Sequence, residues 1–230
     1  MAFYLLALML AFILSAADSF TEHITPEKLR KNKKLISFSA GVAVSYIILN
    51  LFPEISSYAL AEGKTIFIYV LLGFISLNLV EQYVYRRAET KKGISMYHKS
   101  INVVYFFIYN LLIGMVLAVF ASQGAAEAFL FFVPFLLYII IKILPQEFKL
   151  KSQASKIFYS MSPMFGALIG ANYISFATSI FGQILSFVTG TLLYSVIRES
   201  LPSDKAEKPL YFLAGVLFYT MIILISWNLI

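Results

Sequence analysis

Long stretches without a single charged residue dominate this chain. Such runs cover 1–17, 35–53, 65–80, 100–126, 128–141, 157–197 and 209–230. A helix needs roughly 20 mostly apolar residues to cross a bilayer, and most of the runs approach or exceed this length. Apolar residues make up 60% of the 230 residues and charged residues only 13%, too extreme a balance for a water-soluble domain. The runs therefore predict an all-α membrane protein, because a helix satisfies its own backbone in lipid.

The number of crossings follows from the lengths of these runs. The run 157–197 is 41 residues long, enough for two helices, and its most polar part, 172–179, is expected to form an external turn. The two shortest internal runs extend past single charged residues. The sequence therefore predicts eight transmembrane helices in one membrane domain, near 2–18, 35–54, 65–85, 100–121, 126–146, 157–174, 179–198 and 209–229.

Lysine and arginine are confined to alternate connections between the predicted helices. Of the 18 basic residues, 17 follow the first, third, fifth or seventh helix, and Lys64 alone lies on the opposite side. Because cytoplasmic loops are enriched in basic residues, we expect both termini outside. The same distribution explains the net charge of +6 without a nucleic acid partner. We expect the lipid bilayer of the plasma membrane as the surroundings.

The N-terminal run 1–17 has a second interpretation. Ser15, Ala16 and Ala17 resemble the cleavage site of a signal peptide, but no Lys or Arg precedes the apolar run. Cleavage would also leave the basic segment 28–34 outside. We therefore favour a first helix that is retained.

Two polar residues near the external end of the second predicted helix stand on one face. Asn50 and Glu54 are four residues apart, and Pro53 between them cannot donate a backbone hydrogen bond. Carboxylate, amide and freed carbonyl oxygens together suit an outer cation vestibule. The alternative is a helix end capped in the headgroup region.

Two further polar positions lie within the predicted helices. Asn110 lies in the middle of the fourth helix, where it could ligate a hard cation or form an interhelical hydrogen bond. Glu81 is expected to pair with Arg86 or Arg87 at the cytoplasmic interface.

Gly166 and Gly170 form a small-xxx-small pattern that is typical of helix packing, and such packing is compatible with a homodimer.

Catalytic signatures are missing from the sequence. It has no cysteine, and its two histidines, His23 and His98, lie outside the apolar runs. Neither a nucleophile elbow, a phosphate loop nor a paired His–Glu metalloprotease motif is present. We expect no enzyme activity and no bound cofactor.

Several motifs, in order along the chain, resemble the ZIP (Zrt/Irt-like) family of divalent metal transporters. The second helix reads FSAGVAVSYIILNLFPE at 38–54, similar to the family's AAGV and HLLPE ends. The third reads LLGFISLNLVEQ at 71–82, and the later helices carry GALIGA at 166–171, SFVTGTLLYSVIRESLP at 186–202 and LAGVLFYTMIILI at 213–225. The resemblance covers nearly the whole chain and implies an eight-helix bundle that transports zinc-type divalent metals.

The metal ligands of the family are largely replaced here. Its fourth helix carries His-Asn-x-x-Asp/Glu-Gly, and the matching stretch 109–114 keeps only Asn110 and Gly114. Its fifth helix carries His-Glu-x-Pro-x-Glu. The stretch 131–136 keeps only Pro134, whereas a competing placement at 142–147 keeps Glu147 near the cytoplasm.

Two functions remain open from the sequence. The first is transport of a divalent metal such as zinc through a degenerate site, with Asn110, Asn50 and Glu54 as its candidate ligands. The second is a transport-inactive ZIP-fold protein with a structural or regulatory partner. A continuous polar path would favour transport, and an aromatic-filled core would favour the partner role. A lipid-modifying enzyme is disfavoured, because no cluster of acidic or histidine residues is apparent.

Overall fold

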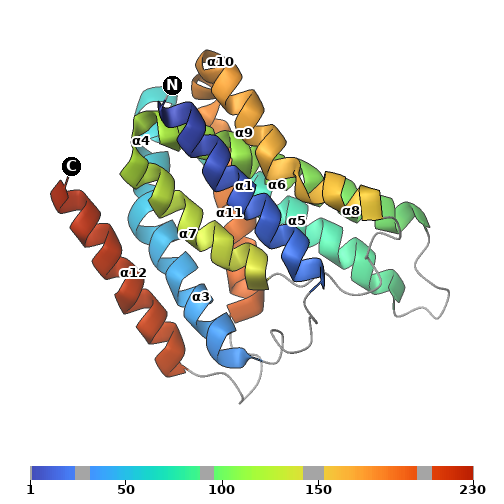
Figure 1. Cartoon of the computed structure of the whole chain (residues 1–230). Helices are drawn as coiled ribbons and strands as arrows, with labels where there is room; N and C mark the ends of the chain where they lie inside the picture. Colours follow the sequence, from blue (N-terminus) through green and yellow to red (C-terminus); the bar gives the residue numbers. More distant parts are fainter. Residues whose placement is uncertain (1, 24–31, 89–95, 142–152, 201–208, 230) are drawn as a thin grey trace.

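The computed structural model describes residues 2–23, 32–88, 96–141, 153–200 and 209–229, and these are entirely helical apart from short turns (Figure 1). The elements are α1 (Ala2–His23), α3 (Lys33–Tyr46), the π-helix η1 (Ile47–Leu51), α4 (Phe52–Glu62), α5 (Ile66–Ala88), α6 (Met96–Gln123), α7 (Ala125–Ile141), α8 (Gln153–Ser160), α9 (Ser162–Asn172), α10 (Ile174–Ser179), α11 (Phe181–Ser200) and α12 (Pro209–Leu229).

Each of the eight predicted segments coincides with helix in the described residues. Four helical segments are long and apolar enough to cross a membrane: Phe3–Phe20, Lys33–Glu62, Val103–Gln123 and Pro209–Asn228. Two shorter apolar helices cover Ile66–Gln82 and Ala125–Ile140. The prediction of an all-helical membrane protein is therefore confirmed at this level.

Two predicted details differ in the structure. The segment 172–179 was expected to be a turn, but most of it forms the short helix α10, which carries the chain from α9 to α11. The sixth segment is not one helix, because α8 and α9 are separated at Met161, just before Pro163. Proline lacks an N–H and clashes with the preceding turn, so it starts a new helix here.

Three pairs of helices run parallel and touch backbone to backbone. α3 packs against α12, α5 against α11, and α6 against α9. The direction is clear for α5 and α11, because Gln183 bonds Glu62 at one end and Arg198 pairs with Glu81 at the other. In each pair, both helices contribute a glycine to the contact.

Each glycine of a pair lies against the backbone of the partner helix. A Cβ built on Gly73 would lie 2.0 Å from the carbonyl oxygen of Phe187, and one on Gly190 would lie 1.9 Å from that of Val70. The same relation holds for Gly41 with Gly215 and for Gly114 with Gly166. Small residues permit this close approach in membrane proteins, where packing rather than water drives association. Gly166, which suggested a homodimer, is therefore used inside the chain.

The helices form two units according to their contacts. The α6 unit consists of α1, α6, α7, α8, α9 and α10, and the α11 unit consists of α3, η1, α4, α5, α11 and α12. Contacts between the units are fewer and come from α3 with α7, α6 with α11 and α5, and α10 with α11. All three glycine pairs lie within a unit, so the units are internally tighter than the interface between them.

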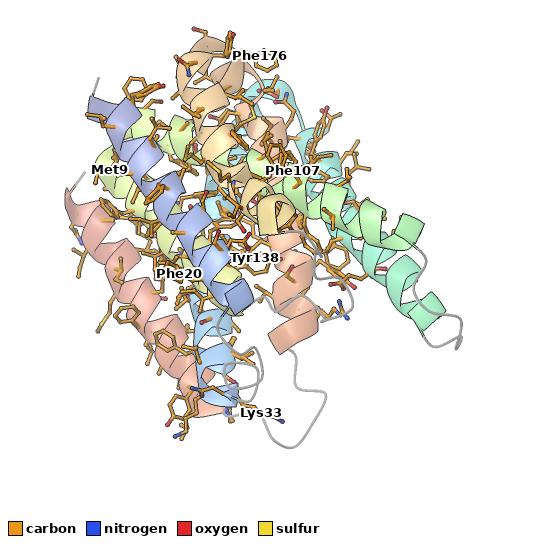
Figure 2. All side chains as sticks on the ribbon, turned by 45° about the vertical axis from the view of Figure 1, so that its right-hand side comes forward. Met9, Phe20, Lys33, Phe107, Tyr138 and Phe176 are labelled. Carbon is orange, nitrogen blue, oxygen red and sulfur yellow. The ribbon has the colours of Figure 1, made fainter. Side chains whose placement is uncertain are left out.

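Side chains of the same apolar type line both the interior and the outer surface. Figure 2 shows Met9 on the outside of α1 and Tyr138 in the interior, in agreement with exposures of 64% and 7%. α12 lies at the edge of the bundle and leaves Leu217 and Met221 exposed (Figure 1). This outer apolar surface suits contact with lipid.

Candidate functional site

A π-helical segment lies at the polar residues near the end of the second predicted span. Pro53 has no N–H, so the carbonyl of Leu49 cannot receive the usual helical hydrogen bond. Over Ile47–Leu51 the helix widens instead, and the N–H of Phe52 donates to the carbonyl of Ile47. Such π-helical turns are rare and occur frequently at functional sites. Asn50 lies inside this turn, and Glu54 follows in the first turn of α4.

Glu127 was missed by the sequence analysis and completes this region. It lies in the first turn of α7, is half-buried, and is close enough to Glu54 for the two carboxylates to interact electrostatically. The ring of Tyr46 contacts Phe131 at 6.3 Å between centroids. Phe131 follows Glu127 by one turn, and Glu127 also acts on Glu54, so α7 runs antiparallel to this segment and Glu127 lies level with Asn50.

The Tyr46 hydroxyl points into the same region. Tyr46 is fully buried, and both Glu54 and Glu127 act on it electrostatically. Asn50 lies beside this hydroxyl, yet no hydrogen bond of normal geometry reaches the Tyr46 oxygen among the described residues. Tyr46, Asn50, Glu54 and Glu127 are called the outer cluster below. It offers oxygen ligands from two units and from four helical elements, α3, η1, α4 and α7.

An aromatic barrier follows directly on the inner side of the outer cluster. Phe131 stacks on Phe135 at 4.3 Å and contacts Phe120 at 5.3 Å, and Phe120 meets Phe181 edge-to-face at 5.2 Å. All four rings are almost completely buried. They come from α6, α7 and α11, so the barrier closes the interface between the two units.

Phenol hydroxyls join the two units on the side of the barrier that faces away from the outer cluster. The Tyr105 hydroxyl of α6 lies 2.9 Å from Ser76 Oγ on α5 and 3.4 Å from Thr191 Oγ1 on α11. The Tyr138 hydroxyl of α7 lies 3.2 Å from Ser195 Oγ on α11. These are single hydrogen bonds, each worth about 0.6–2 kcal/mol in membrane proteins.

One such bond lies at the level of the barrier itself. The Tyr219 hydroxyl of α12 donates to the Leu130 carbonyl of α7 at 2.5 Å. The interface between the units is therefore held by aromatic edges and isolated phenol bonds rather than by backbone contact.

An ion pair marks the opposite end of the α11 unit. Glu81 was predicted to pair with Arg86 or Arg87, but the structure pairs it with Arg198 of α11. The partner is on another helix because α5 and α11 lie parallel, so residues near their ends meet. The pair is partly exposed and contributes little to stability.

The three residues predicted as metal ligands do not come together. Asn50 and Glu54 lie in the outer cluster of the α11 unit, whereas Asn110 belongs to α6. Asn110 precedes Phe120 of the barrier by ten residues, about 15 Å along the helix. Asn110 is 2% exposed, and no hydrogen bond reaches its Oδ1 within the described residues.

The expected positions of the family ligands on the fifth span are apolar and filled. Phe131, Phe132 and Phe135 are buried in α7 around Pro134, and the competing placement at 142–147 lies outside the described residues. Within the described ranges, no three His, Asp or Glu side chains form a group that could hold a metal ion. Two carboxylates, at Glu54 and Glu127, are the most that this region brings together.

Comparisons with known proteins add no family assignment. No family model matches the chain, and no curated protein matches it either.

Proposed function

We propose that this chain is a ZIP-like, multi-pass transporter of divalent cations, and that the ion moves along the interface between the α6 unit and the α11 unit. The observation that carries the proposal is the position of the polar side chains. The outer cluster, the Tyr105 and Tyr138 hydrogen bonds and the aromatic barrier all lie where the two units meet. A path at the interface of two internally rigid units can open to either side by small relative movements.

The proposal includes a membrane topology. Eight helical segments alternate in direction, and the order of basic residues puts both termini outside, in the plasma membrane. The first described basic residue, Lys33, begins α3, and Lys64 precedes α5 at the other end of the second span. Figure 2 places Lys33 at the end of the molecule opposite to Phe176 of α10.

Because the chain contains no cysteine, single cysteines can test this topology directly. We expect Lys64→Cys to react with a membrane-impermeant maleimide in intact cells and Lys33→Cys to react only after permeabilisation. Lys64 and Lys33 are both exposed, so access to the reagent depends on the side of the membrane. The reverse labelling pattern would contradict the proposed orientation.

The outer cluster supplies the ligands that meet the ion first. Its donors are carboxylate, amide and phenol oxygens, which suit hard cations such as Mn²⁺ better than zinc, for which imidazole and thiolate donors are typical. Two carboxylates from different units would neutralise a divalent charge. We therefore expect manganese to compete with zinc at this entrance.

Metal uptake into liposomes tests the transport proposal. Purified protein is reconstituted and supplied with zinc, iron, manganese or cadmium outside. We expect saturable uptake, reduced about tenfold or more in the Glu54→Gln/Glu127→Gln variant, because neutral amides cannot replace both charges. Glu62→Gln is the matched control, since Glu62 lies at the exposed end of the same helix as Glu54 and bonds Gln183.

A second function is favoured by the aromatic barrier. Phe120, Phe131, Phe135 and Phe181 fill the centre of the interface, which suits a transport-inactive ZIP-fold protein with a structural or regulatory partner. Folded protein that shows no uptake above empty liposomes for any of the four metals would support this function. If uptake is saturable and the double variant leaves it unchanged, the ion does not pass through the outer cluster.

A further inference from the structure

Within the described residues, four buried serine and asparagine oxygens of the α6 unit lack a hydrogen-bond partner. They are Ser15 Oγ of α1, Asn110 Oδ1 of α6, Ser160 Oγ at the end of α8 and Ser162 Oγ at the start of α9. None of the four residues is more than 5% exposed. Polar groups removed from water are costly unless something polar meets them, and this cost is high among apolar helices.

Contacts between α6 and the α8–α9 region bring three of these residues to one level. Phe107 of α6 stacks on Phe158 at 5.6 Å, and about two turns further along α6, Gly114 lies against the backbone of Pro163. Asn110 lies between Phe107 and Gly114. Ser160 and Ser162 lie between Phe158 and Pro163 in the partner segment.

The fourth residue reaches the same level from α1. The Asn172 side chain at the end of α9 lies 3.4 Å from the Tyr4 hydroxyl near the start of α1. Ser15 follows Tyr4 by eleven residues, about 16 Å along α1. The same distance, measured from Asn172 back toward the start of α9, reaches Met161. Met161 lies between Ser160 and Ser162.

Helix faces direct Ser15 and Asn110 toward a common interior. Ser15 shares a face of α1 with Ala7 and Ala11, which are fully buried. On α6, Gly114 faces α9 and Phe120 faces α7 and α11. Asn110 lies between these two faces, on the side that α1 covers by its contacts with α6, α7 and α9.

The break between α8 and α9 adds a backbone ligand at this level. Pro163 cannot donate to the carbonyl of Tyr159, so the usual helical bond is not formed there. Interrupted helices in membrane proteins use such carbonyl groups to coordinate Na⁺. The helix break and the four oxygens therefore coincide.

The charge of the surroundings sets the class of ligand. The donors are neutral oxygens, and α6, α8 and α9 contain no aspartate or glutamate. Neutral oxygens suit a monovalent cation better than a divalent one, because the double charge of a divalent ion costs more to bury uncompensated.

We infer that α1, α6 and the α8–α9 break enclose a site for a hard monovalent cation, with Na⁺ as the ion to test. Ser15, Asn110, Ser160 and Ser162 are its ligands. This site is separate from the outer cluster and does not depend on whether the chain transports a divalent metal.

Thermal unfolding of the purified, full-length protein in detergent tests the site. The wild-type midpoint is measured in NaCl, KCl and choline chloride at equal ionic strength. We expect a saturable rise of about 3–8 °C with Na⁺ relative to choline, because the ion binds only the folded state. Radioactive ²²Na⁺ binding to the same protein gives a second measurement of occupancy.

Two variants locate the site, and one serves as a matched control. Asn110→Leu and Ser162→Ala should abolish the rise with Na⁺ while keeping the midpoint in choline, because each removes an oxygen that lacks a partner. Thr189→Val removes an equally buried hydroxyl of α11 that already donates to Leu185, and it should keep the full rise with Na⁺. Ser162→Ala is the smaller change and is informative even if Asn110→Leu does not fold.

The outcomes separate the proposal from its alternatives. Equal midpoints in NaCl, KCl and choline, with no ²²Na⁺ bound, would show that water alone occupies the interior and would overturn the site. A rise with Na⁺ that persists in both variants would place the ion elsewhere and would also overturn it. A rise with both Na⁺ and K⁺ that both variants lose would support a monovalent site without selectivity.

Discussion

Alanine at position 190 is expected to destabilise the protein by about 3 kcal/mol or more, a large effect for a single methyl group. The Cβ of Gly190→Ala would lie 1.9 Å from the carbonyl oxygen of Val70, so α5 and α11 would have to separate. Because the obstacle is backbone rather than a flexible side chain, no rotamer change relieves it. Thermal unfolding in detergent should show a midpoint lower by about 6–12 °C and a smaller monodisperse yield.

Gly124 provides the control for this experiment. It lies between α6 and α7 with nothing within 4 Å of a built Cβ, so Gly124→Ala should unfold at or slightly above the wild-type temperature. Gly73→Ala should behave like Gly190→Ala, and the double variant should cost less than the sum, because both glycines belong to one contact. A wild-type midpoint for Gly190→Ala would contradict the backbone contact between these helices.

Removal of the Phe131 ring is expected to cost about 3–5 kcal/mol. Phe131 is fully buried and touches Tyr46, Phe120 and Phe135, so Phe131→Ala leaves a cavity that its rigid aromatic neighbours cannot fill. The cavity lies in the aromatic barrier, between the outer cluster and the inner phenol bonds. The measurement is thermal unfolding together with cation leakage from liposomes that contain the variant.

Phe129→Ala is the matched control on the same helix. Phe129 is 49% exposed on the outer surface, so its removal should change the midpoint by less than about 1 kcal/mol and leave leakage at the wild-type level. If the proposed path is correct, Phe131→Ala should increase leakage as well as lower stability. A Phe131→Ala variant that is destabilised but does not leak cations would support the transport-inactive alternative.

The positions of the helices along the chain could be predicted because the thickness of the lipid bilayer imposes a length on each apolar segment. Helix partners could not be predicted, because the residues that face lipid and those that face the interior are of the same type. On α1, Leu5 and Met9 are exposed while Leu10 and Leu14 are buried, and no polar alternation separates them. In a water-soluble protein the hydrophobic pattern would have given that information.

The candidate site was predicted only in part, for a similar reason. Asn50 and Glu54 were placed on one face of a helix near Pro53, and the structure has them there, with a π-helical turn that no periodicity revealed. Glu127 was overlooked because its contact with Glu54 joins residues far apart in sequence. A charged residue that interrupts the apolar run 100–141 was the signal that could have identified it.

The parallel glycine pairs also determine when each unit can be completed during synthesis. The α6 unit joins α6 to α9, so its glycine contact forms once the chain has been made as far as Gly170. The α11 unit is different, because Gly41 of α3 and Gly73 of α5 meet their partners only on α12 and α11. Until the ribosome has delivered the last two helices, the flat faces of α3 and α5 lie against lipid or a membrane chaperone. The last-made helices therefore complete the packing of two helices that are made much earlier.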